Sequence, residues 1–242
     1  YSIMAIFELI EFDKIHSLRK LNGLPGHPDI ETDGIITNTG SLGMGISKAK
    51  GFIQSSRLKG INRNVFVLLG DGELQEGQIW ESLRSASNDR MGELYIIVDN
   101  NKIQSDNWVE LTSHNDNLTR KFESFGCKVA EINGHDFSEI QYTFENLQHI
   151  NDKPKVIIAN TIKGNGVSFM HADSNIRESD YEYPYHSGAL NNEEYFMALD
   201  ELILTLNLKL TDIGEKSISL KKHSKDMILN NNEMIGLIDY YS

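Results

Sequence analysis

The chain has 242 residues, of which 39% are hydrophobic and 24% charged, so it can bury a core and is not a disordered tail. Its 23 basic and 35 acidic residues give a formal charge of −12, so recognition of nucleic acid or of an acidic membrane surface is not expected. One cysteine excludes a disulfide framework, and no apolar run reaches the ~20 residues of a membrane span, so we expect a cytoplasmic protein.

Short apolar runs alternate with helical patterns through most of the chain. Because these runs are continuous rather than alternating, they are typical of buried parallel strands. The expected strands are residues 65–69, 94–98 and 156–159, with a weaker candidate at 128–132. The expected helices are 43–58, 75–87, 117–125 and 137–150. This order predicts an α/β fold with a parallel sheet and helices on both faces, and ligands bind such sheets beyond the carboxyl ends of the strands.

The last part of the sequence is less regular. Residues 172–188 are polar and rich in tyrosine, which indicates a long loop, and residues 191–208 form a plausible amphipathic helix. Residues 215–242 are helix-like but mixed in character. We therefore expect one domain over residues 1–208 and a helical extension over 209–242, whose role the sequence leaves open.

Two polar turns follow two of the predicted strands. Asp71 lies between Gly70 and Gly72 after the first strand, and Asn101 follows the second. Neighbouring strands would bring the carboxylate and the amide oxygen together, as a hard divalent cation requires. The two glycines allow a phosphate to approach the backbone, and a helix near Gln75 directs its positive end to the same place. The pair predicts a metal–diphosphate site, although either turn alone is usually structural.

The motifs around these turns resemble those of the transketolase family. The matching segments run in order over roughly residues 1–205. They are Gly26-His27-Pro28, residues 39–45, 70–81, 99–104 and 161–166, and a later His186. Residues 40–45 are rich in glycine but do not follow a strand, so a Rossmann nucleotide site is a poor interpretation. The resemblance implies the diphosphate-binding domain of a thiamine-diphosphate enzyme, with the thiamin-diphosphate-binding fold.

The resemblance also implies a ligand set for metal and cofactor. Asp71, Asn101 and the carbonyl of Ile103 would bind Mg²⁺ or Ca²⁺. Leu42 and Ile162 would pack against the rings of the cofactor. The cofactor-binding residues implied as a whole are Gly40, Leu42, Gly70, Gly72, Glu73, Asn101, Ile162 and Lys163.

Four further residues receive roles in the reaction from the resemblance. His27 and His186 would face the reacting carbon and the sugar hydroxyls, with His171 as a competitor for the second position. Glu76 and Glu81 would lie at an interface between chains. His135 matches a common turn of the family, where we interpret it as structural.

The family's activating glutamate lies on a second, pyrimidine-binding domain that this sequence does not match. We therefore expect the amino-terminal subunit of a split transketolase, which works with a carboxyl-terminal subunit, as an α₂β₂ assembly, on sugars or sugar phosphates. The expected reaction transfers a two-carbon ketol unit from a ketose to an aldose. Two alternatives stay open: a decarboxylating synthase of the deoxyxylulose-phosphate type, and a non-catalytic regulatory relative.

Overall fold

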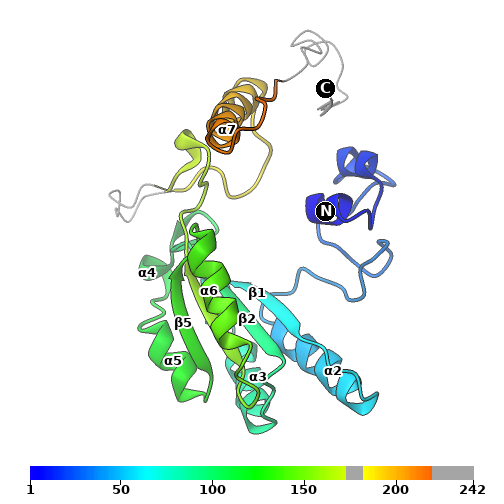
Figure 1. Ribbon diagram of the computed structural model, residues 1–242, viewed down its shortest axis with the longest axis vertical. Coiled ribbons are helices and arrows are strands. Elements are labelled where there is room, and N and C mark those ends of the chain that lie inside the picture. Colours follow the sequence, from blue (N-terminus) through cyan, green and yellow to red (C-terminus); the bar gives the residue numbers. More distant parts are fainter. Residues whose placement is uncertain (173–181, 220–242) are drawn as a thin grey trace. The chain divides into compact units, whose positions relative to one another are not determined.

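The computed structural model describes residues 1–172 and 182–219 (Figure 1). The chain forms two compact units. We call Leu42–Leu190 the sheet unit, and Tyr1–Ser41 together with Asn191–Ser242 the terminal unit. Each is described by itself.

Four parallel strands form the centre of the sheet unit. Their order is β1-β2-β6-β5, and they are β1 (Val65–Gly70), β2 (Leu94–Asn100), β5 (Lys128–Asn133) and β6 (Lys155–Asn160). The register pairs Gly70 with Asp99 and Asp99 with Ala159, so the carboxyl ends of β1, β2 and β6 meet at one edge. All four predicted strands are confirmed, including the weaker candidate.

Helices cover both faces of this sheet, as predicted (Figure 1). Residues of α2 (Gly45–Leu58), α3 (Gly77–Asn88) and α5 (Leu118–Ser124) pack on one face of the strands in the larger core cluster. The opposite face packs on α6 (Phe137–Leu147) in a smaller cluster that includes Tyr95 and Ile157. Because Ile96 and Ile157 are both fully buried but belong to different clusters, the central strands are apolar on both faces.

The strand β1 departs from the expectation of burial on both faces. Val67 and Leu69 are buried, whereas Phe66 and Leu68 remain 56% and 70% exposed. β1 is an edge strand of the sheet, and α6, which contacts Phe66 through Phe144 on this same face, packs mainly on β5 at the opposite edge. The continuous apolar run therefore predicted the strand correctly. It wrongly predicted that both faces of the strand are buried, because one face stays exposed within the described residues.

Several element boundaries differ from the sequence-based ones by a few residues. The expected helix at 75–87 begins at Gly77, because a short 3₁₀ turn, η2 (Gly72–Gln75), precedes it. The expected helix at 137–150 ends at Leu147. Small elements not predicted from sequence are β3 (Ile103–Gln104), β4 (Asn107–Trp108), α4 (Val109–Thr112) and η3 (Ser168–Met170).

The terminal unit contains α1 (Ser2–Ile6), η1 (Phe12–Ser17) and α7 (Asn192–Asp212). The side chain of Asn191 accepts a hydrogen bond from the Glu194 N–H, and the Glu194 carboxylate accepts one from the Asn191 N–H, which makes a capping box at the start of α7. The helix runs beyond residue 208, and residues 215–219 are not helical. The rest of the expected extension lies outside the described residues. In the described ranges we find no helix with the length and apolar character of a membrane span.

Candidate active site

The two predicted metal ligands lie together at the carboxyl edge of the sheet. Asp71 follows β1 directly, caps η2 and is only 2% exposed. Its Oδ1 accepts a hydrogen bond from the N–H of Gly72 at 2.8 Å, and its Oδ2 accepts one from the N–H of Lys102 at 2.6 Å. Because Lys102 follows Asn101, the two predicted turns are bonded directly to each other.

The turn after β2 is also tied to the loop after β6. The Oδ1 of Asn101 accepts from the N–H of Ile103 at 3.0 Å, and its amide donates to Asp99 at 3.2 Å. The other carboxylate oxygen of Asp99 accepts from the hydroxyl of Thr161, which directly follows β6. Three strand ends therefore share one polar network, while metal coordination by Asn101 and the Ile103 carbonyl remains a prediction.

The environment of Asp71 fits a bound cation. Burial raises the pKa of Asp71 to about 6, and the N–H groups of Lys102 and Gly72 oppose that rise. None of the salt bridges in residues 1–172 and 182–219 includes Asp71. A buried carboxylate without a counter-ion is costly, and it keeps lone pairs beyond the two N–H bonds that a cation can use.

The set of donors is closer to a magnesium site than to a transition-metal site. No group of three or more His, Cys, Asp or Glu side chains suited to a metal occurs in the part of the chain that the structure describes. One carboxylate, an amide and a carbonyl leave positions open, and Mg²⁺ commonly fills such positions with water and phosphate oxygens.

Lys163 lies in the loop after β6, next to the second predicted histidine. Its Nζ is 3.1 Å from Nδ1 of His186 and 5.4 Å from the ring centre of Tyr183. Burial lowers the pKa of Lys163, while the charges of Asp99 and Asp71 oppose this shift. A partly buried ammonium group close to this edge is suited to contact an anionic group such as a diphosphate.

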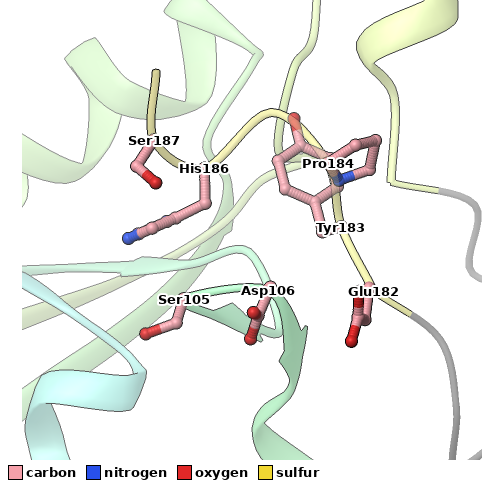
Figure 2. A pocket seen from close by; sticks show the side chains of 7 residues that line it. All are labelled: Ser105, Asp106, Glu182, Tyr183, Pro184, His186 and Ser187. Carbon is pink, nitrogen blue, oxygen red and sulfur yellow. The ribbon is translucent and has the colours of Figure 1, made fainter.

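A polar cavity of about 500 Å³ opens beside His186. Figure 2 shows the side chains of His186, Ser105 and Tyr183 around this cavity. The lining includes Ser105, Asp106, Glu182, Tyr183, His186 and Ser187. Hydroxyl, carboxylate and imidazole groups around one cavity suit a ligand with several hydroxyls. His171, the competitor of His186, instead accepts from the N–H of Gly166 at 3.3 Å.

Glu73 joins two glycine-containing turns of the predicted site. Its Oε1 accepts from the N–H of Gly43 at 2.8 Å, and its Oε2 accepts from the N–H of Gly70 at 3.2 Å. Gly43 has φ +78°, and a Cβ added there would lie 2.8 Å from Cβ of Glu76. Both carboxylate oxygens thus face the backbone, and direct contact of Glu73 with a cofactor stays a prediction.

Two apolar residues predicted to pack on cofactor rings are exposed at this side of the sheet unit. Leu42 is 60% exposed and Ile162 is 48% exposed, so both have surface available for a ring. Gly72 fits closely beside Gln104, since an added Cβ would lie 2.5 Å from Cβ of Gln104. Close approach of the Gly72 backbone to a diphosphate remains a prediction.

The remaining predicted residues lie outside this network. Glu76 is the N-cap of α3 and Glu81 lies within that helix, both of them exposed, and their place at an interface stays a prediction. His27 and Gly40 belong to the terminal unit, where a Cβ added to Gly40 would lie 3.2 Å from Cγ of His27.

Sequence reasoning assigned no role to two residues that support the site. The amide of Asn115 donates to the backbone carbonyl of Asp71 at 2.7 Å, and no sequence signal indicates this. Asp99 accepts hydrogen bonds from Asn101 and Thr161. It lies in the motif of residues 99–104, and its position as the last carboxylate before the end of the strand could have indicated this role.

Comparisons with known proteins agree with this fold. Residues 1–180 match the family described as transketolase, thiamine diphosphate binding domain. The chain is 38% identical over 180 residues to a subunit of the apulose-4-phosphate transketolase of Actinobacillus succinogenes, covering 74% of this chain and 62% of that protein. It is 35% identical over 180 residues to the 6-deoxy-6-sulfo-D-fructose transketolase subunit SqwG of Clostridium sp., with coverage of 74% and 62%.

Solved structures give the same result for the fold. The transketolase of Campylobacter jejuni superposes with a TM-score of 0.68 at 30% identity, over 78% of this chain and 30% of that one. The transketolase of Leishmania mexicana gives 0.63 at 23% identity, over 88% and 37%, and this likeness concerns the fold alone.

The fold and the family match define an α/β domain of the thiamine-diphosphate-binding class. The chain belongs to the family of transketolase thiamine diphosphate-binding domains. The comparisons support transketolase over the decarboxylating synthase that the sequence left open. The matched residues span about three fifths of the length of these curated relatives.

Proposed function

We propose that the carboxyl edge of the sheet unit holds thiamine diphosphate through Mg²⁺ or Ca²⁺. The observation that carries this proposal is the buried Asp71, which is bonded to the Asn101 turn and makes no salt bridge with any described residue. Asp71, Asn101 and the carbonyl of Ile103 would be the protein ligands of the cation. Lys163 would contact the diphosphate, since its ammonium group lies near the same edge.

The other cofactor contacts follow from the resemblance and from exposure. The apolar side chains of Leu42 and Ile162 would cover the rings, and the carbonyl of Gly40 would accept from the aminopyrimidine. Glu73 would act by holding Gly43 and Gly70 in place. When bound, the cofactor supplies an electron sink for the carbon–carbon bond that breaks.

We further propose that the chain's own side chains orient the sugar. His186 lies on the polar cavity, 3.1 Å from Lys163, where its ring can hydrogen-bond to sugar hydroxyls. His27 takes the corresponding role near the reacting carbon on the basis of its motif. The reaction proposed is transfer of a two-carbon ketol unit from a ketose to an aldose.

A second chain completes the enzyme in this proposal. The two relatives from Actinobacillus succinogenes and Clostridium sp. are each named as one subunit of a transketolase. By analogy we propose a partner that carries the pyrimidine-binding domain, in an α₂β₂ assembly, with Glu76 and Glu81 at the interface. The substrates proposed are sugars or sugar phosphates. We propose a cytoplasmic location for the enzyme.

The experiment is ketol transfer with purified chains. The full chain is assayed alone and with its candidate partner, using a ketose donor, thiamine diphosphate and Mg²⁺. We expect transfer only with both chains, and we expect Asp71→Ala to abolish it by removing the cation ligand. The matched control is Asp152→Ala, an exposed carboxylate just before the amino end of β6, at the edge of the sheet opposite the site, which should leave transfer unchanged.

The outcomes separate the parts of the proposal. Activity of the chain alone contradicts the need for a partner. Full activity of Asp71→Ala contradicts the cation site. Binding of the cofactor by the complex without transfer to any aldose favours the regulatory alternative.

A further inference from the structure

The loop of residues 161–166, which we call the 161–166 loop, directly follows β6, which ends at Asn160. Its last hydrogen bond to a strand is a long one, from the N–H of Thr161 to the carbonyl of Asn100 at 3.5 Å. The loop carries Ile162 and Lys163, to which the proposed function gives cofactor contacts. Backbone N–H groups in such a segment require other partners.

Two histidines supply partners for two of these N–H groups, one near each end of the loop. Nε2 of His135 accepts a hydrogen bond from the N–H of Ile162 at 2.8 Å. Nε2 of His171 accepts one from the N–H of Gly166 at 3.3 Å. An imidazole nitrogen accepts only when it carries no proton, so both rings are bound as the neutral form with the proton on Nδ1.

The tautomer of His135 also constrains its other neighbour. Nδ1 of His135 lies 3.1 Å from Nδ2 of Asn165, which belongs to the same loop. Because Nδ2 can only donate, a proton on Nδ1 requires the flipped orientation of the Asn165 amide, with its oxygen toward the ring. One imidazole therefore binds the loop at two points, a backbone N–H and a side chain.

The turn that carries His135 is held by hydrogen bonds on both sides of the ring-bearing residue. The N–H of His135 donates to Oδ1 of Asn133 at 3.0 Å. The next residue, Asp136, caps α6 by accepting from the N–H of Ser138 at 2.8 Å. A Cβ added to Gly134 would lie 2.5 Å from the methyl of Thr161, so the turn and the loop are in close contact. The ring is thus presented to the loop by a fixed support.

The other end of the loop has a similar support. The N–H of Ala172 donates to the carbonyl of Lys163 at 3.0 Å, and His171 immediately precedes it. Gly164 has φ +79°, and a Cβ there would lie 1.9 Å from the carbonyl oxygen of Met170. The segment 170–172 therefore packs directly on the loop.

We propose that His135 and His171 are positioning residues that hold the 161–166 loop in the conformation that presents Ile162 and Lys163. The inference rests on the proposed function only for the cofactor contacts of Ile162 and Lys163. The hydrogen bonds from the loop to the two histidines are made within this chain. Neither ring contacts the reacting atoms in this assignment. Their contribution is to lower the cost of ordering the loop before a cofactor binds.

The first test is amide hydrogen exchange on the full chain without cofactor. His135→Phe keeps a ring but removes the acceptor, and His135→Gln places an amide oxygen close to the position of Nε2. We expect exchange at Ile162 to become about five- to tenfold faster in His135→Phe and to return toward the native rate in His135→Gln. His149→Phe, a change at an exposed histidine of another segment, is the control and should leave Ile162 unchanged.

The same pair of changes at His171 tests the other end of the loop. Because its contact is longer, we expect a smaller acceleration of about two- to threefold at Gly166 in His171→Phe, with recovery in His171→Gln. Long-range ¹⁵N–¹H correlations in the native chain should show both rings protonated at Nδ1. Unchanged exchange in both Phe variants, or a proton on Nε2 of His135 at neutral pH, overturns the proposal.

The second test links the loop to cofactor binding in the complex with the partner chain. We expect His135→Phe to weaken thiamine diphosphate binding about three- to tenfold, while kcat at saturating cofactor stays within about twofold. Faster exchange with unchanged cofactor affinity overturns the positioning role. Failure of the native complex to bind cofactor contradicts the proposed function instead, and the exchange experiment still decides whether the rings hold the loop.

Discussion

The charged side chains at the two ends of the four-stranded sheet have different partners. At the amino ends of the strands, Arg57 binds both carboxylate oxygens of Glu93 at 2.7 Å. Lys155 is 1% exposed and forms no salt bridge among the described residues, but its Nζ lies 4.0 Å from the ring centre of Tyr95 and its charge lowers the pKa of Glu93. At the carboxyl ends, Asp71 is equally buried but has no ion-pair partner in the described residues.

This difference separates structural charges from charges prepared for a ligand. Charges that have a direct partner inside the chain, such as Arg57 with Glu93 and Lys155 with the ring of Tyr95, need no ligand. A buried carboxylate that makes no salt bridge costs stability, and a bound cation would recover part of that cost. The carboxyl edge is therefore where binding is expected, and substitutions at the two ends should have different consequences.

The largest effect is expected from Asp71→Asn. The change keeps the size of the side chain and one acceptor but removes the charge that we propose holds the cation. Mg²⁺-dependent binding of thiamine diphosphate to the complex should weaken at least about 100-fold, measured by titration calorimetry. The melting temperature of the ligand-free chain should shift by less than about 4 °C. Retention of Mg²⁺-dependent binding would show that the cation is held elsewhere.

Arg57→Ala should give the reverse pattern. The guanidinium loses the paired contact with Glu93 and hydrogen bonds to the carbonyls of Asp89 and Arg90 at 3.0 and 3.1 Å. We expect a loss of about 1–2 kcal/mol in the free energy of unfolding, reduced by the partial exposure of the pair, with unchanged cofactor affinity. Urea denaturation measures it, and Arg63→Ala, at an exposed arginine, is the control. Equal loss in both variants would contradict a specific role for the pair.

A smaller effect is expected from pH at the same ion pair. The hydrogen bond from Arg57 lowers the pKa of Glu93 below its ordinary value. A lowered carboxyl pKa contributes stability that is complete above the unfolded value of about 4.3 and is lost as pH falls through the folded value. The stability difference between the native chain and Arg57→Ala should therefore be constant from pH 7 to 5 and shrink below about pH 4. A difference that grows on acidification would contradict this assignment.

The smallest effect is expected from Lys155→Met. The change replaces a buried ammonium group by an apolar chain of similar length, and the desolvation cost removed offsets the lost contact with Tyr95. The free energy of unfolding should change by less than about 1 kcal/mol. Lys128→Met, at the exposed lysine paired with it in register, provides the comparison. A loss of several kcal/mol would show that Lys155 has an essential buried partner.

Much of the sheet unit was predictable because its signals are local. Continuous apolar runs identified β1, β2 and β6, and glycine-containing turns at their ends identified Asp71 and Asn101. Exposure of Phe66 and Leu68 was not predictable, because the cover of an edge strand depends on where other segments pack. The role of Asn115 was also hidden, since a single amide in a loop has no sequence pattern.

The histidines show the same division in the site itself. His135 and His171 were interpreted from sequence as a structural turn and as a competitor for a catalytic position. Only the fold shows that both rings accept N–H groups from one loop. These contacts join residues that are 27 and 5 positions apart, and the spacing of residues in a sequence does not encode such pairings.

The sequence by itself determined the class of the fold, the order of strands and helices along the chain, and the residue types suited to bind a cation and a diphosphate. It could do so because periodicity and turn chemistry act over a few residues. The tertiary structure decided that β1, β2 and β6 end at one edge, so that Asp71 is bonded to the turn of Asn101 and Lys163 lies beside His186. That arrangement depends on long-range packing, which buries the carboxylate of Asp71 without a salt bridge among the described residues.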